Sequence, residues 1–77
     1  MSYDYSVLNG RIVEKFGTQY KFSLAMGLSE RTMSAKLNGL SPWKNTEILK
    51  AVKLLDVDID EIPKYFFNVK VHEHELI

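Results

Sequence analysis

Apolar residues along most of the chain recur three or four positions apart, which is the spacing of an amphipathic helix. Glycines and good capping residues separate these runs, so each helix must be short. Asp58 and Glu61 have the form of a capping box for a fifth helix, which Pro63 limits to about one turn. The pattern predicts an all-α fold, with helices over residues 5–16, 19–26, 30–38 and 45–55, the last capped by Asn45.

The stretch from Thr18 to Gly39 carries the strongest signal of function. Thr18 and Ser29 are good N-caps, Gly27 suits a tight turn, and Asn38 with Gly39 suits a helix end. Two short helices around a glycine turn form a helix-turn-helix, whose second helix can enter a major groove about 12 Å wide. The apolar positions expected to lock the two helices together are Phe22, Met26, Leu28, Met33 and Leu37.

Composition limits the classes of function that remain. The chain has 77 residues and no cysteine, which indicates one small domain without disulfides, thiol nucleophile or Cys-ligated metal. It shows no phosphate loop, nucleophile elbow or acid–base pair, so we expect neither an enzyme nor a bound cofactor. No apolar run approaches the ~20 residues of a membrane span, and the first nine residues do not resemble a signal peptide. We therefore expect a cytoplasmic protein without membrane association.

The formal net charge of zero conceals a strong asymmetry along the chain. Residues 1–53 hold eight Lys and Arg against four Asp and Glu, whereas residues 54–77 hold two against six. Such a split indicates a polyanionic partner for the basic part, although solvated helix faces alone also produce it.

The helix-turn-helix segment resembles the lambda Cro/C1-type family, in its sequence TQYKFSLAMGLSERTMSAKLNG. The resemblance extends from Tyr5 to about Phe66, and the whole is similar to small Cro-like and modulator-of-repression proteins of temperate phages infecting Gram-positive bacteria. Two residues depart from the family pattern: Ser23 stands where Ala is usual, and Lys36 stands where a buried apolar residue is common. The resemblance implies a five-helix Cro/C1-type, lambda repressor-like domain with a C-terminal extended segment.

The resemblance also implies which residues read DNA bases. Glu30, Arg31, Ser34 and Ala35 fall at the base-reading positions of the family. A guanidinium such as that of Arg31 can bond guanine bidentately, worth about 1–3 kcal/mol against a wrong base. Glu30 can accept from cytosine, although the helix dipole alone also favours a carboxylate in the first turn. Ser34 and Ala35 mainly provide clearance for the groove.

Other residues are candidates for contact with phosphate. The resemblance places the start of the first helix of the motif against the DNA backbone. For the lysines in this group, a solvated charge that contacts nothing is an equal alternative. The candidates are Thr18, Gln19, Ser29, Lys36, Asn38, Lys44 and Asn45.

The end of the chain changes from helical to strand spacing. Phe67, Val69 and Val71 alternate with polar residues, and a lone strand needs a hydrogen-bonding partner. We expect residues 67–77 to be an extended tail on the domain of residues 1–66, and either to pair with a second copy or to stay without sheet pairing. The predicted dimer contacts are Phe66, Phe67, Val69 and Val71; coverage of the domain's own core by residues 65–67 is an equal alternative.

The single tryptophan and the two histidines each have a structural and a functional interpretation. Trp43 can stack on a base, but a single Trp in a loop before a helix more often fills the core, which we expect here. His72 and His74 share one face of a strand without a third metal ligand nearby, so we expect a solvated terminus and no metal.

These observations predict a sequence-specific DNA-binding repressor of the Cro type in a phage lysis–lysogeny switch. One short helix reads few base pairs, so operator recognition implies two half-sites and a homodimer. The alternative is an antirepressor, or modulator, that binds a partner repressor protein. Zero net charge, Glu30 and the acidic residues 56–61 favour this alternative. A DNA-binding antitoxin is a third option.

Overall fold

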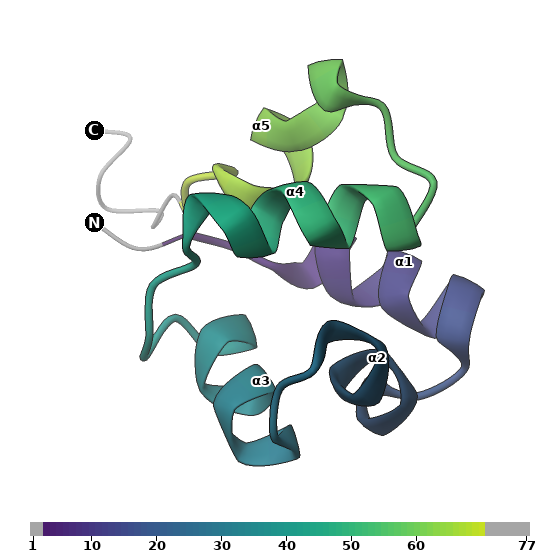
Figure 1. The fold of residues 1–77 in the computed structure, drawn as a ribbon. Coiled ribbons are helices and arrows are strands. Elements are labelled where there is room, and N and C mark those ends of the chain that lie inside the picture. Colours follow the sequence, from purple (N-terminus) through teal and green to yellow (C-terminus); the bar gives the residue numbers. More distant parts are fainter. Residues whose placement is uncertain (1–2, 71–77) are drawn as a thin grey trace.

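The computed structural model describes residues 3–70, and over this range the chain forms five α-helices and one turn of 3₁₀ helix (Figure 1). The predicted all-α fold is confirmed. In Figure 1, α4 crosses the front of the molecule, with α5 above it and the pair α2 and α3 below. The elements are α1 (Ser6–Phe16), α2 (Gln19–Met26), α3 (Glu30–Leu37), α4 (Asn45–Leu54), η1 (Ile59–Glu61) and α5 (Ile62–Phe66).

Side-chain caps and a glycine turn set the bounds of α2 and α3. The Thr18 hydroxyl accepts a hydrogen bond from the Lys21 N–H at 3.1 Å, and α2 begins directly after it. The Ser29 hydroxyl accepts from the Thr32 N–H at 3.0 Å and starts α3 in the same way. Each cap satisfies one of the N–H groups that lack a partner inside the helix. The bounds predicted for α2 are confirmed, and α3 ends one residue earlier than expected.

The start of α4 and the region before α5 differ from the predictions. The cap of α4 is Lys44 and not Asn45, because the Glu47 carboxylate accepts the Lys44 N–H at 2.9 Å and extends the helix by one residue. The capping box predicted at Asp58 is wrong, since the Glu61 N–H bonds to the Asp58 backbone carbonyl at 2.9 Å and forms the tight η1 turn. Pro63 stands at the beginning of α5, where no N–H is needed, so it starts that helix rather than shortening it.

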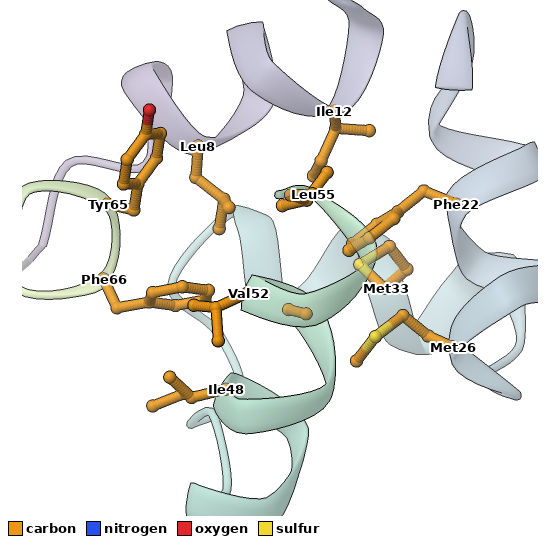
Figure 2. Close-up of a cluster of buried hydrophobic side chains, with 11 residues drawn as sticks. Leu8, Ile12, Phe22, Met26, Met33, Ile48, Val52, Leu55, Tyr65 and Phe66 are labelled. Carbon is orange, nitrogen blue, oxygen red and sulfur yellow. The ribbon is translucent and has the colours of Figure 1, made fainter. Parts of the chain in front are cut away.

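The hydrophobic core is centred on α4. Figure 2 shows side chains of α1, α2, α3 and α5 converging on the inner side of α4. Phe22 and Phe66 lie at opposite sides of this cluster and are 0% and 2% exposed. Because α2 and α3 bury one apolar side each against this centre, their other sides face outward. The core residues are Leu8, Ile12, Phe22, Met26, Met33, Ile48, Ala51, Val52, Leu55, Tyr65 and Phe66.

The aromatic residues near the chain ends belong to the domain itself. Trp43 packs edge-on against Phe66 with ring centroids 5.1 Å apart, which confirms that it covers the core. Phe66 is enclosed in this core and cannot also contact a second copy, so its assignment as a dimer contact is wrong. Phe67 packs edge-on against Tyr3 at 5.7 Å and remains 48% exposed.

The beginning of the predicted tail pairs within the chain. Tyr3 and Val69 form an isolated antiparallel bridge, and the Asp4 N–H donates to the Asn68 carbonyl at 2.6 Å. The partner of the extended segment is therefore the N-terminal segment of the same chain, at least as far as Val69. Val71 and the two histidines lie outside the described residues.

None of the helices in residues 3–70 has the length and apolar character needed to cross a membrane.

Candidate nucleic-acid interface on α2 and α3

The connection between α2 and α3 is a three-residue turn built on Gly27. Gly27 is in the left-handed conformation with φ 73°, which residues other than glycine adopt only at an energetic cost. Its N–H donates to the Leu24 carbonyl at 3.1 Å, and the Leu28 N–H donates to the Ser23 carbonyl at 3.0 Å. These two bonds end α2 sharply, so α3 departs in a new direction as a separate helix (Figure 1).

The inner sides of the two helices are held by buried side chains. Phe22 and Met33 are 0% exposed and lie together beside α4 (Figure 2). Ser23, which stands where the Cro/C1-type pattern usually has Ala, is also buried. Its hydroxyl donates to the Tyr20 carbonyl at 2.6 Å, so the polar group keeps a partner inside the helix. This departure from the family pattern therefore leaves the packing of α2 intact.

The residues predicted to read bases lie on the outer side of α3. Glu30 and Arg31 are exposed in its first turn, and Ser34 and Ala35 are half-buried one turn further on. The Asn38 amide donates to the Ser34 carbonyl at 2.9 Å and to the Ser34 hydroxyl at 3.3 Å. The surface is thus a low, polar helix side with one projecting guanidinium, which is a shape that a major groove accepts.

Several of the predicted phosphate contacts surround this side. Gln19 and Asn38 both line a hollow of about 210 Å³, whose other walls come mainly from residues 3–9 and Lys70. Thr18 and Ser29 are exposed, but both hydroxyls already accept cap hydrogen bonds. Accepting a cap bond leaves the O–H of each hydroxyl as a donor, and the Ser29 O–H donates to Thr32 Oγ1 at 2.9 Å. A phosphate at these positions could thus be bound by the Thr18 hydroxyl and by backbone N–H groups of the helix starts.

Lys36 does not belong to this surface, and its assignment as a phosphate contact is wrong. Only 3% of the residue is exposed, and its Nζ atom lies 2.8 Å from Glu47 Oε1 and 2.8 Å from the Pro42 carbonyl. The ammonium also lies over the Trp43 ring, 5.9 Å from the centroid. A buried charge is stable only when it is paired and hydrogen-bonded, and these three contacts meet that need. The amine is consequently turned away from any DNA.

The same contact shifts the pKa of Glu47, the carboxylate that pairs with Lys36. Burial by itself would raise the pKa of Glu47. The hydrogen bonds from the Lys36 ammonium and the Lys44 N–H, together with the charges of both lysines, outweigh burial and lower the pKa. Glu47 therefore stays ionised and ties the loop after α3 to the start of α4.

The structure also exposes an apolar residue on α2, Leu24, that was not expected there, beside Tyr20 near the start of the helix. Tyr20 and Leu24 lie one turn apart on the outer side of α2 and are 53% and 61% exposed. Tyr20 and Leu24 are four positions apart and fall on a different side of the helix from the buried Phe22 and Met26. This spacing in the sequence indicates an apolar outer side of α2. Lys21 is exposed between them, whereas Lys44 and Asn45 are exposed at the start of α4. The outer side of α2 is thus partly apolar.

Comparison with known proteins places this arrangement in a family. The chain belongs to a family described as proteins of unknown function (DUF739), whose model matches residues 1–69. No curated protein matches the chain.

One solved structure is similar over nearly the whole length of both chains. It is the solution structure of the modulator of repression (MOR) of the temperate bacteriophage TP901-1 from Lactococcus lactis. The two sequences are 65% identical, the TM-score is 0.78, and the match covers 94% of this chain and 97% of that chain. The resemblance to modulator-of-repression proteins of temperate phages is thereby confirmed, while membership of the Cro/C1-type family stays a prediction.

Proposed function

We propose that this chain regulates repression in a temperate phage, and that the outer side of α2 and α3 is the surface through which it acts. The observation that carries the proposal is the match to a phage modulator of repression over 94% of the chain at 65% identity. Two short helices at a glycine turn, with Arg31 and Glu30 exposed at the start of the second, support the choice of surface. A regulator of this kind needs no catalytic group and works in the cytoplasm of the host.

The first mode of action is direct binding of operator DNA. In this mode α3 enters the major groove, Arg31 reads a guanine, and the region around Gln19 and Asn38 lies against phosphates. The exposed polar side of α3 supports this mode. Because one helix of eight residues covers only a few base pairs, the mode requires a homodimer on two half-sites.

The second mode is binding of a partner repressor protein, and the charges favour it. With Lys36 paired to Glu47, the exposed cations within α2 and α3 are Lys21 and Arg31, against the carboxylate of Glu30. Each neutralised phosphate contributes about −0.9 to the salt slope of DNA binding, so two cations support only weak affinity. The exposed apolar pair on α2 instead suits a protein surface, where aromatic residues are enriched and lysines are depleted.

A titration with DNA and with the repressor distinguishes the two modes. A fluorescent duplex from the phage switch region is titrated at about 50 mM and about 200 mM salt, with the wild type and with Arg31→Ala. Direct reading predicts a loss of about 5- to 150-fold for the preferred site on Arg31→Ala, and little loss for random DNA. The matched control is Lys64→Ala, an exposed lysine on α5, which should change neither affinity.

The second mode predicts no binding of DNA even at low salt. It predicts instead that the purified repressor binds the wild type, and that Leu24→Asp or Arg31→Ala weakens this binding while Lys64→Ala does not. If neither DNA nor repressor binds, or if the α2 and α3 variants bind like wild type, the proposed surface is wrong.

A further inference from the structure

The outward side of α4 carries an apolar and positively charged surface formed by residues other than those of α2 and α3. A hollow of about 290 Å³ is lined by Thr46, Leu49, Lys50 and Lys53. Leu49 is 50% exposed and also lines a second hollow of about 220 Å³, beside Ile62 and Phe67 of the α5 region, so the two hollows adjoin. We call the residues Thr46, Leu49, Lys50 and Lys53 the α4 surface.

The positive charge of the α4 surface is not balanced from within α4. The single carboxylate of that helix, Glu47, is directed to the buried Lys36, and its side chain is 14% exposed. Lys50 is held in position because its ammonium donates to the Met26 carbonyl at the end of α2, at 3.2 Å. Lys53 takes part in no ion pair among the residues described. A partner that brings carboxylates and an apolar side chain would complement this surface.

The same chain exposes a group with that composition. Ile59, in the η1 turn, is 68% exposed and stands between the exposed Asp58 and Asp60. Ion pairs in the described part of the chain use Asp56 and Glu61, and neither of the two aspartates beside Ile59. We call Asp58, Ile59 and Asp60 the acidic turn.

We propose that the α4 surface binds the acidic turn of a second copy of this chain. Ile59 would enter the hollow beside Leu49, and the aspartates would approach Lys50 and Lys53. Residues 54–57 separate the two groups in sequence, and a two-fold axis between the copies would form the same contact twice. The net charge of zero removes the general repulsion that keeps like molecules apart.

The described part of the tail exposes 48% of Phe67 and 40% of Val69, but it is already partly used within the chain. Phe66 is inside the core, and Val69 is bridged to Tyr3 of the same chain. Because the two groups contain only seven residues, we expect the contact to bury less than the roughly 1,200 Å² of a standard interface, so the dimer should be weak and sensitive to salt. The proposal does not depend on whether α3 binds DNA or protein.

Sedimentation velocity of the full chain tests this contact. Between about 20 µM and about 1 mM, the average mass should rise from that of the 8.9 kDa monomer toward twice that value, and rise less at about 500 mM salt. Leu49→Asp should weaken association at least about tenfold, as should Ile59→Asp. The matched control is Val13→Asp, because Val13 is 51% exposed on α1 and should leave association unchanged.

A charge exchange separates this contact from a general effect of charge. Lys53→Asp and Asp60→Lys should each weaken association, and the double variant should restore it. The proposal is overturned if the chain stays monomeric at about 1 mM, if Val13→Asp acts like Leu49→Asp, or if the double variant is no better than the singles. Loss of the dimer on Val69→Asp together with an intact dimer on Leu49→Asp would assign the contact to the tail instead.

Discussion

Replacing Lys36 with methionine tests whether this lysine is a structural cation rather than a contact for DNA. Methionine keeps the unbranched apolar stem and removes the ammonium that binds Glu47 and the Pro42 carbonyl, each at 2.8 Å. The substitution leaves Glu47 with the Lys44 N–H as its remaining partner. We expect a large loss of stability, because a mostly buried carboxylate then lacks its counter-charge.

The exposed fractions of the Lys36 and Glu47 side chains determine how much stability the substitution should remove. Four per cent of the Lys36 side chain and 14% of the Glu47 side chain are exposed, so the pair is close to fully buried. Removing one partner of a buried pair costs about 3–5 kcal/mol, and the residual exposure of Glu47 places this case near 3 kcal/mol. A domain of this length has a free energy of unfolding of roughly 4–12 kcal/mol, so the variant loses a large fraction of it.

Urea unfolding followed by circular dichroism measures this free energy. Lys36→Met should lower it by about 3 kcal/mol, whereas Lys21→Met, at an exposed lysine on α2, should change it by less than about 0.5 kcal/mol. Adding Glu47→Gln to Lys36→Met should recover part of the loss, since the amide oxygen still accepts the Lys44 N–H without carrying a charge. If Lys36→Met is as stable as wild type, the amine is in solvent and a role in phosphate binding returns.

Three further predictions concern the turn, the cap and the ion pair. Gly27→Ala should lower the free energy of unfolding by about 1–2 kcal/mol, because the φ of 73° strains any residue with a Cβ, as thermal unfolding would show. Ser29→Ala should cost about 1 kcal/mol through loss of the α3 cap, and Ser29→Asp, which keeps an acceptor, should cost less in the same assay. The pKa of Glu47 is below its ordinary value of 4.5 in the folded state, so its stabilising effect is present above about pH 4.5 and is lost as the pH falls through the folded pKa. Acid titration of stability should therefore be flatter below pH 4.5 for Glu47→Gln than for wild type, and equal slopes would contradict the assignment.

Sequence reasoning located α2 and α3 because their bounds depend on local chemistry. The hydroxyls of Thr18 and Ser29 bond to N–H groups three residues later, and Gly27 adopts its positive φ within the same turn. Such interactions involve residues that are close in sequence, so the pattern of capping and glycine residues contains them. The exposed position of Arg31 on α3 follows directly from the buried position of Met33.

The errors about Lys36, the tail and Phe66 arose where the outcome depends on residues far apart in the chain, whereas those at Asn45 and Asp58 concern which local hydrogen bond starts the helix. Lys36 is buried because Glu47, on the next helix, meets it across the loop, and a helical pattern of polar residues does not reveal this pairing. The bridge between Tyr3 and Val69 joins two segments too short to be identified as strands. The sequence is compatible with Phe66 either in the core or at a dimer contact. Its packing against Trp43 in the folded chain places it in the core.

The proposed recognition surface is best tested by a residue-resolved titration. Backbone amide signals of the labelled chain are followed by NMR while the purified repressor of the same phage, or operator DNA, is added. We predict that the largest changes occur at Tyr20, Leu24, Glu30 and Arg31, with little change at Leu49 on α4 and Ile59 in the η1 turn. Changes confined to α4 and the η1 turn, with α2 and α3 unaffected by both partners, would contradict the proposed role of the outer side of α2 and α3.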